Sequence, residues 1–455
     1  MADGGGARRG CDGSLRPAER PVTGDDLART LTAQLGEHHG GRVRLCGWAH
    51  AVRAGSDPAI VELRDHTGVA QLLVGRGGKL QGLLERLVRG SAIETIGSVE
   101  ADPSGGWRVV VELLDVPGPA AGSPPIGESS ALEERLDWRY LDLRRPRNRL
   151  IFEVQTTALR MMRDVWQEQG FIELHSPKLR PIPNKSGDEL FSLDYFGRRA
   201  YLAQSPQFYK QMAMAAGFDR VFDIGPVFRQ QRQPSSRHDT EFTSVDVEMS
   251  WIRSMEDLLA FEENLLCRVI AGVRAAHADE LQRWFGRELT VPTTPFPRMT
   301  LDEAKQVVAA TGCPIDDADD DLSPAGERRL AEHVARELDH EFVFLTDYPE
   351  PARPFYHMRC GEDTLATRSF DLLWRGLEIT SGAQREHRYD RLVTQARTRG
   401  IPVAHIQGYL DYFKFGCPPH GGFGLGLTRM LMSMLDVDDV REVTYLFRGP
   451  DRLTP

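Results

Sequence analysis

A proline- and glycine-rich segment divides this sequence into two unequal parts. Residues 116–130 read VPGPAAGSPPIGESS, with four prolines and three glycines in 15 positions. Such a composition disfavours helix and strand, so it predicts a linker between two folded domains. We expect a first domain over 23–117, a linker over 118–131 and a second domain over 132–455, after a disordered tail at 1–22 that lacks apolar periodicity.

The part before the linker is patterned as short strands. Between Arg42 and Leu114, β-favouring runs such as RVRLCGWAHAVR and WRVVVELLDV alternate with turn residues, and one helical run, KLQGLLERLVRG (79–90), interrupts them. Five strands with an inserted helix predict a small Greek-key barrel of the oligonucleotide-binding (OB) class.

The part after the linker mixes helices and strands too irregularly for a doubly wound parallel sheet. An amphipathic helix is predicted over 149–170, with one apolar face formed by Ile151, Val154, Leu159, Met162 and Val165. Strand-like runs follow, among them RVFDIGPVFR, FTSVDVEMSWI and GGFGLGL. We therefore predict an α+β domain, a mainly antiparallel sheet flanked by helices.

Charge and cysteine content exclude several classes of protein. Acidic residues outnumber basic ones by 66 to 56, a formal charge of −10, so any contact with nucleic acid must be local. The six scattered cysteines contain no C-x-x-C pair, which argues against a zinc ribbon or a disulfide framework and for a reducing compartment. No apolar run approaches the roughly 18 residues of a membrane span, so we expect a cytoplasmic protein with no membrane contact.

Two segments of the second part carry candidate chemistry, and each has a plainer interpretation. Two strand-like runs within 220–252 bear Arg229, Asp246 and Glu248, which could present a cation to a polyphosphate and carboxylates to a metal or an ammonium group. Taken alone, the segment is better explained as a hairpin with solvated charges, because such hairpins are common. The glycine-rich run 421–429 ends in Arg429 and suits close approach of a phosphate or nucleobase, but also close packing of a strand against a helix.

A third segment, 368–390, contains candidate metal ligands. Asp371 and Glu378 are seven positions apart and would face opposite sides of a strand unless Arg375 and Gly376 form a turn. With such a turn, Glu378, Thr380 and Ser381 offer hard oxygen ligands for Mg²⁺. Arg385 could pair with a substrate carboxylate. The plainer interpretation is a salt-bridged strand edge.

These three segments, with GFIELHSPKL upstream, resemble the signature motifs of class II aminoacyl-tRNA synthetases. The resemblance is closest to the aspartyl-tRNA synthetases of archaeal and eukaryotic type. It is carried by YLAQSPQFYKQ (201–211), RSFDLLWRGLEITSGAQREHRYD (368–390), FGCPPHGGFGLGLTR (415–429) and the terminal RLTP, and it covers nearly everything from Arg42 onward.

The resemblance implies ATP and Mg²⁺ as cofactors, tRNA and L-aspartate as partners, and a homodimer with Pro177 at its interface. It implies that Arg229 binds the α-phosphate of ATP, that Arg429 lies against the adenine on the face opposite Phe242 or reaches the γ-phosphate, and that these two arginines are the catalytic residues. The further implied roles are adenine stacking by Phe242, binding of the outer phosphates by Arg237 and His238, metal binding by Asp371, Glu378 and Ser381, and aspartate binding by Gln207, Lys210, Asp246, Ser381 and Arg385.

The sequence departs from the family pattern at a few positions. Lys185 stands where a glutamate usually meets the substrate ammonium, and a like charge there disfavours binding. In the barrel, Gln71 matches a residue that reads the middle anticodon base, but Ile60 replaces the expected aromatic. His50 stands where family members restricted to aspartate tRNA carry a second tryptophan.

The resemblance therefore predicts an ATP-dependent aspartate–tRNA ligase that charges both tRNA(Asp) and tRNA(Asn), with a glutamine-dependent amidotransferase as an implied partner. Two alternatives remain: a paralogue that activates aspartate for another acceptor, which Lys185 and Ile60 could signal, and a non-catalytic nucleic-acid-binding regulator. The second alternative leaves no use for Arg229, Glu378, Arg385 and Arg429.

Overall fold

The structure is a computed structural model that describes residues 27–455, apart from positions 54, 56 and 76 and segments 182–189, 316–319 and 362–363. The predicted tail, 1–22, and Lys185 lie outside the described residues. The chain forms two compact units that divide between Gly127 and Glu128, within the proline- and glycine-rich segment.

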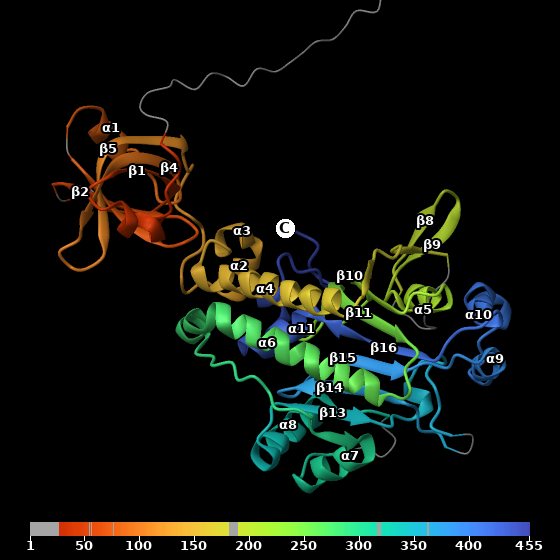
Figure 1. The fold of residues 1–455 in the computed structure, drawn as a ribbon. Helices are drawn as coiled ribbons and strands as arrows, with labels where there is room; N and C mark the ends of the chain where they lie inside the picture. The colour runs from red at the N-terminus through yellow and green to blue at the C-terminus, as the bar shows by residue number, and fades with distance from the viewer. Residues whose placement is uncertain are drawn as a thin grey trace, which may run out of the picture. The chain divides into compact units, whose positions relative to one another are not determined.

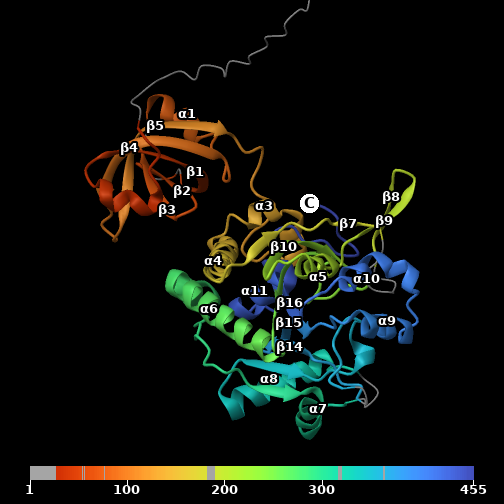
Figure 2. The ribbon, with the colours of Figure 1, turned by 45° about the vertical axis from the view of Figure 1, so that its right-hand side comes forward.

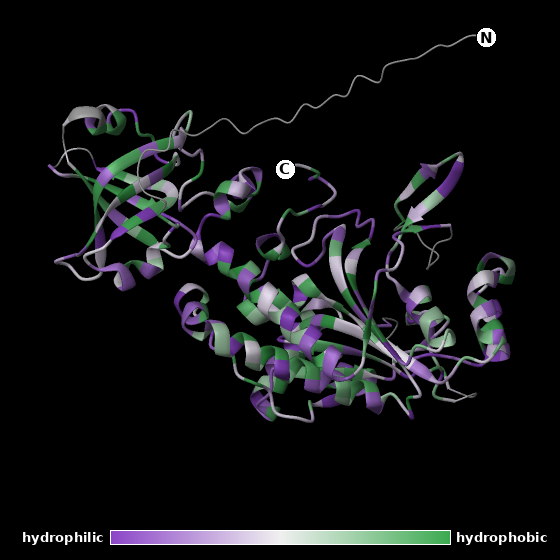
Figure 3. Ribbon diagram, turned by 45° about the horizontal axis from the view of Figure 1, so that its top comes forward, coloured by the Kyte–Doolittle hydropathy of each residue, from purple (hydrophilic) through white to green (hydrophobic). Residues whose placement is uncertain are grey.

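The first unit is a closed five-stranded barrel in the order β1-β2-β3-β5-β4, as predicted (Figure 1). Along β2 and β3, buried residues alternate with less buried ones, and Val61 and Leu72 are fully buried, which is the two-residue period of a strand. Hydrophobic and hydrophilic stretches follow one another along the barrel strands (Figure 3). A Cβ at Gly47 or Gly97 would lie 2.3 or 2.2 Å from a carbonyl oxygen of a neighbouring strand, so these two positions require glycine. The elements of this unit are η1 (Thr32–His38), β1 (Arg42–Arg53), β2 (Ala59–Arg64), β3 (Val69–Val74), α1 (Gly78–Leu84), β4 (Ala92–Ala101) and β5 (Trp107–Gly118).

Helix α1 is shorter than the helical run predicted for 79–90. The helix ends at Leu84 because the amides of Arg86 and Leu87 donate to carbonyls three residues back, which tightens the chain and buries Leu87 in the barrel core.

The second unit is built on an eight-stranded sheet in the order β12-β13-β14-β15-β16-β11-β10-β6. The outer pairs, β12–β13 and β10–β6, are parallel and the pairs between them are antiparallel, so the predicted α+β class is confirmed. The strands are β6 (Ile172–Leu174), β10 (Arg220–Phe228), β11 (Glu241–Ser250), β12 (Arg298–Thr300), β13 (Phe342–Thr346), β14 (Ser369–Trp374), β15 (Leu377–Gln384) and β16 (His420–Gly426). A separate small sheet holds β7 (Leu179–Arg180), β9 (Arg198–Leu202) and β8 (Ser192–Tyr195).

Two long helices, α4 (Pro146–Glu168) and α6 (Glu256–Phe285), pack against one face of the large sheet (Figures 1 and 2). Helix α4 begins with Pro146 at its first position and buries the predicted apolar face, except that Leu159 is only partly buried. None of the described helices combines the length and the apolar character needed to cross a membrane. The other helices are α2 (Leu132–Asp137), α3 (Arg139–Asp142), α5 (Gln207–Ala215), α7 (Leu301–Ala310), α8 (Pro324–Leu338), α9 (Tyr389–Thr398), α10 (Gln407–Lys414), α11 (Leu427–Leu435) and α12 (Val440–Val443), with 3₁₀ turns η2 (Glu350–Ala352) and η3 (Val403–Ile406).

Candidate active site

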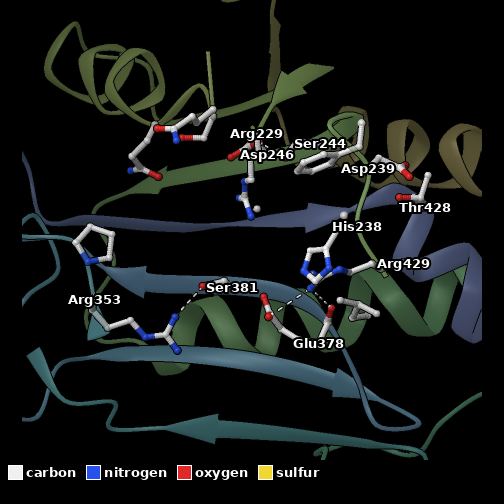
Figure 4. Close-up of a pocket in the computed structure, with 18 of the residues that line it drawn as sticks. Arg229, His238, Asp239, Ser244, Asp246, Arg353, Glu378, Ser381, Thr428 and Arg429 are labelled. Carbon is white, nitrogen blue, oxygen red and sulfur yellow. Dashed lines mark hydrogen bonds and ion pairs between the residues drawn. The ribbon is translucent and has the colours of Figure 1, made fainter. Parts of the chain in front are cut away.

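A cavity opens on the face of the large sheet that α4 and α6 do not cover (Figure 4). Strand alternation creates it: in β11, Val245 and Val247 join the core, whereas Ser244 and Asp246 line the cavity. Among the predicted site residues, Lys210 and Asp371 lie behind the cavity lining and are 2% and 3% exposed. The predicted residues that line the cavity are Gln207, Arg229, Arg237, His238, Phe242, Asp246, Glu378, Ser381, Arg385 and Arg429.

Three arginines and a histidine meet at one end of this cavity. Arg429 donates from Nη2 to Nε2 of His238 over 2.9 Å and from Nη1 to the carbonyl oxygen of Glu378 over 2.9 Å. Burial and three neighbouring guanidinium groups, led by that of Arg429, lower the pKa of His238 to about 4, so its ring is neutral at pH 7. Arg229 lies over the ring of Phe242, 5.3 Å from its centroid. The positive charge of this end suits a polyphosphate.

The glycines of the glycine-rich strand β16 differ in their surroundings: some are required for packing between strands, and others line the cavity. A Cβ on Gly422 would lie 2.0 Å from the carbonyl oxygen of Val247, so this glycine serves strand packing. Gly424 and Gly426 line the cavity instead. At Gly424 a Cβ would lie 3.2 Å from Oδ1 of Asp246 and would narrow the cavity.

The turn required to bring the candidate metal ligands together is present. Arg375 and Gly376 have φ values of 54° and 76° and join β14 to β15, so that Asp371 lies opposite Ser381. An irregularity in the pairing of these strands lets Glu378 and Ser381, three positions apart, both line the cavity. Their carboxylate and hydroxyl oxygens are ligand types that Mg²⁺ accepts, and Oε2 of Glu378 also lies 3.3 Å from Nη1 of Arg429.

Asp371 has another partner, which the sequence did not predict. Arg353 donates from Nη2 to Oδ2 of Asp371 over 2.5 Å and from Nη1 to Oγ of Ser381 over 3.1 Å, and its guanidinium lies 3.6 Å from the ring centroid of Tyr348. One carboxylate oxygen of Asp371 is therefore occupied by a buried cation, while Oδ1 is buried without a hydrogen-bond partner among the described residues.

The other end of the cavity is backed by two cations that share a buried carboxylate. Lys210 contacts Oδ1 of Asp246 at 2.9 Å and Oε2 of Glu248 at 3.3 Å, and Arg385 donates from Nε to Oε1 of Glu248 over 3.0 Å. Burial alone would raise the pKa of Glu248, but Arg385 and Lys210 outweigh burial and the pKa is lowered. Glu248 is fully buried and holds both cations in place.

The loop 350–358 was not recognised from the sequence. Arg353 and His357 of this loop both line the cavity, and Arg385 donates from Nη1 to Nε2 of His357 over 2.9 Å. Arg399, directly after α9, fixes this loop by donating to the carbonyl oxygens of Glu350, Pro351 and Arg353 over 2.7–3.1 Å. Its sequence, EPARPFYHM, carries no general motif. Glu248, by contrast, had a signal, because it lies two positions from Asp246 on one strand face.

The barrel residues singled out from the sequence lie on its outer surface, in adjacent strands. His50 is in β1, Ile60 in β2 and Gln71 in β3, and all three are half-buried. Arg64 of β2 donates to Nε2 of His50 over 2.8 Å, and Gln71 lies opposite Glu62. These side chains therefore form one outward-facing surface of β1, β2 and β3.

The family described as "tRNA synthetases class II (D, K and N)" matches residues 131–448, and "OB-fold nucleic acid binding domain" matches residues 43–116. An aspartate–tRNA(Asp/Asn) ligase of Methanopyrus kandleri is 42% identical over 92% of this chain and 97% of its own length. An aspartate–tRNA(Asp) ligase of Pyrococcus abyssi is 37% identical over 92% of this chain and 97% of its own length. An asparaginyl-tRNA synthetase of Pyrococcus horikoshii, solved with asparaginyl-adenylate, superposes with a TM-score of 0.87 at 30% identity and covers 94% of this chain and 100% of that one.

Proposed function

The chain belongs to the class II tRNA synthetases and is an aspartate–tRNA ligase, and from this premise we propose how its residues carry the reaction and which tRNAs it charges. The resemblance seen in its motifs is thereby confirmed. One observation supports the site assignment above others: a single cavity has an arginine cluster at one end and the Lys210–Arg385 pair behind the other. These are the two charge patterns that ATP and aspartate require.

The arginine end binds ATP. Arg229 contacts the α-phosphate, Phe242 stacks on the adenine, and Arg237, His238 and Arg429 contact the outer phosphates. When the α-carboxylate of aspartate attacks the α-phosphate, negative charge grows on its oxygens, and Arg229 stabilises that charge. Pyrophosphate leaves past the remaining cations. No side chain forms a covalent bond, because positioning and electrostatics suffice.

Glu378 and Ser381 hold Mg²⁺, which neutralises phosphate charge when it is bound. Asp371, which the sequence grouped with them, contributes through Arg353: this arginine is bonded to both Asp371 and Ser381, so it fixes the rotamer of the seryl ligand. Asp371 therefore orients a metal ligand through Arg353 and does not itself bind the ion.

The other end of the cavity selects aspartate. Arg385 contacts its side-chain carboxylate, and Lys210 adds its positive charge from behind the cavity lining. Gln207, Asp246 and Ser381 orient its amino-acid backbone. Both cations are held by Glu248, so they cannot turn away when a neutral side chain enters. Asparagine would leave them without the charge that they were placed to meet, and a desolvated charge without its partner costs several kcal/mol.

The enzyme charges both tRNA(Asp) and tRNA(Asn). The two anticodons differ only in their last base, so discrimination depends on the outer barrel surface that bears His50 and Gln71. Histidine offers less contact area than an indole, and Ile60 cannot stack on a base as an aromatic would. The product aspartyl-tRNA(Asn) requires a glutamine-dependent amidotransferase as the next enzyme. We place the reaction in the cytoplasm.

The working form is a homodimer. Strand β6 is an edge of the large sheet, and Ile172 on it is 48% exposed. Trp251 is 70% exposed and lines a hollow together with Gln169 and Arg220, near the end of α4. An apolar edge strand with a neighbouring exposed tryptophan is a surface that a second copy would cover, with Pro177 close to the same edge.

Aspartate-dependent exchange of pyrophosphate into ATP tests the function directly. Exchange should be supported by aspartate far better than by asparagine or glutamate, and both tRNA transcripts should then accept aspartate. Equal exchange with asparagine would refute the two-cation assignment. Exchange without transfer to either tRNA would favour an enzyme that serves another acceptor.

A further inference from the structure

The hairpin of β8 and β9 projects from the second unit (Figures 1 and 2). All residues from Ser192 to Arg199 are exposed, so the hairpin packs little of itself against the unit. Phe196 at the tip is 86% exposed, and Tyr195 beside it is 40% exposed. Isolated two-stranded hairpins are marginally stable in water, and exposed aromatic rings on one call for a partner.

The turn at the tip is built at a conformational cost. Phe196 and Gly197 have φ values of 53° and 75°, the signs of a two-residue type I′ turn. Such a turn favours asparagine or aspartate at its first position, whereas a bulky side chain there is strained. An exposed phenylalanine in a left-handed conformation serves neither folding nor solubility, so its ring has another use.

The two faces of the hairpin differ. Tyr195 pairs with Arg198 across the strands, and Leu193 and Ala200 follow on the same face, while Asp194 and Arg199 lie on the other. We name the first of these the aromatic face. Ala200 is buried, so the base of the aromatic face continues into the body of the unit. Neither Arg198 nor Arg199 forms an ion pair with any residue that the structure describes, in a chain whose formal charge is −10.

The base of the hairpin is fixed beside the cavity. The amide of Ala203, next to the end of β9, donates to the carbonyl of Lys178, and its carbonyl accepts from the amide of Phe228, over 2.9 Å each. Phe228 precedes Arg229, and Gln204, Ser205 and Gln207 after the hairpin line the cavity. Main-chain bonds therefore fix the base of the hairpin next to segments that line the cavity.

We propose that the aromatic face and Phe196 bind the unpaired 3′-terminal nucleotides of the tRNA. Aromatic rings can stack on the bases of single-stranded RNA, and the neighbouring guanidinium of Arg198 can contact its phosphates. The 3′ end of a tRNA acceptor arm is such a single strand, and it must reach the cavity to receive aspartate. Strands of four and five residues at 3.4 Å per residue extend the hairpin by about 14–17 Å from its base to its tip, so the hairpin guides the RNA strand toward the cavity. This inference rests on the proposed transfer of aspartate to tRNA.

Two variants test the contact. Phe196→Asn removes the ring and suits the turn better, so the melting temperature should not fall. Arg198→Gln removes the guanidinium of the aromatic face, and Arg199→Gln is the matched control on the opposite face. Phe196→Asn and Arg198→Gln should each raise the KM for tRNA about five- to tenfold over wild type, and Arg199→Gln should raise it less than about twofold. None of the three should alter aspartate-dependent exchange, because that reaction needs no tRNA.

Binding of a transcript that lacks its 3′-terminal CCA locates the contact. Wild type should bind the shortened tRNA more weakly than the full one, and Phe196→Asn should bind both with the same reduced affinity. The inference is overturned if Phe196→Asn loses equal affinity for both transcripts, if Arg199→Gln matches Arg198→Gln, or if the variants change the oligomeric state in gel filtration, which would make the hairpin a subunit contact. A wild type that charges no tRNA would instead refute the proposed function.

Discussion

The catalytic cavity and the outer surface of the barrel hold their recognition residues in opposite ways. Lys210, Arg385 and Glu248 are 2%, 2% and 0% exposed and form one connected set of ion pairs. His50 and Gln71 are half-buried side chains on the outside of the barrel. Removing a member of a buried set leaves another charge without a partner, whereas changing an outer side chain costs little beyond its own contacts. A substitution in the buried set should therefore destroy aspartate activation without changing which amino acid is selected. A substitution on the outer barrel surface can change which tRNA is selected while the enzyme stays active.

The largest expected effect is at Arg385. Arg385→Leu should lower kcat/KM for aspartate in the exchange reaction by about two to three powers of ten, because breaking a buried ion pair costs about 3–5 kcal/mol. Arg385→Lys retains the charge but loses the two N–H donors that contact both oxygens of Glu248. Its kcat/KM for aspartate should therefore lie between the values of wild type and Arg385→Leu. A cooperative thermal unfolding transition would verify that each Arg385 variant is folded. A loss below tenfold would break the comparison, since the buried set would then be no more sensitive than the barrel surface.

A second buried carboxylate makes stability depend on pH. Glu262 of α6 is fully buried, and burial raises its pKa to about 8. The folded state therefore keeps a proton that the unfolded chain releases above its ordinary pKa of about 4.5, so stability falls as pH rises from about 4.5 to 8. Glu262→Gln lacks this loss, and its free energy of unfolding relative to wild type should rise on the order of 3 kcal/mol between pH 5 and pH 8.

Urea unfolding at the two pH values measures this difference. Asp279→Asn, an exposed position on the same helix, provides the baseline. A constant difference between Glu262→Gln and wild type would mean that the carboxyl is ionised at both pH values.

Architecture was readable from the sequence, but the pairing of charges was not. Alternation along β2 and β3 and the apolar face of α4 are local periodicities, so the barrel and the α+β class of the second unit could be predicted from the pattern of residues. The ten predicted residues that line the cavity came instead from the resemblance of the motifs to a known family. Arg353 meets Asp371, and His357 meets Arg385, through a loop whose position depends on bonds from Arg399 across the fold. Such contacts join residues that no periodicity relates. The predicted length of helix α1 was wrong for a similar reason, because burial of Leu87 in the barrel core outweighed the local helix propensity of the segment.

The metal ligands give a comparison within the cavity itself. Glu378→Gln should raise the Mg²⁺ concentration for half-maximal exchange about tenfold or more, because it removes a charged ligand that lines the cavity. Asp371→Asn should raise it less than about threefold, because that carboxylate is held by Arg353. Titration of exchange activity with Mg²⁺ at saturating ATP separates the two. An equal effect would make Asp371 a direct ligand, as the sequence suggested.

The smallest expected effect is at the barrel, where one outer side chain should reset tRNA choice. Wild type should charge tRNA(Asp) and tRNA(Asn) within about tenfold of each other, since one mismatched base typically changes binding by about 1–3 kcal/mol even in a well-formed site. His50→Trp should shift kcat/KM toward tRNA(Asp) by about tenfold. It replaces the ring bonded to Arg64 with a larger one that offers more contact area to the last anticodon base.

Side-by-side aminoacylation of the two transcripts measures this ratio, with aspartate-dependent exchange as the internal control, because the cavity residues are untouched. A wild-type preference of a hundredfold for tRNA(Asp) would refute dual charging. If wild type is relaxed and His50→Trp is no stricter, the determinant lies elsewhere on the outer surface, and Ile60→Phe becomes the next substitution because it restores a ring that can stack on the middle base. In either case exchange should stay unchanged, since an outer barrel side chain can alter tRNA choice without disturbing a buried ion-pair set.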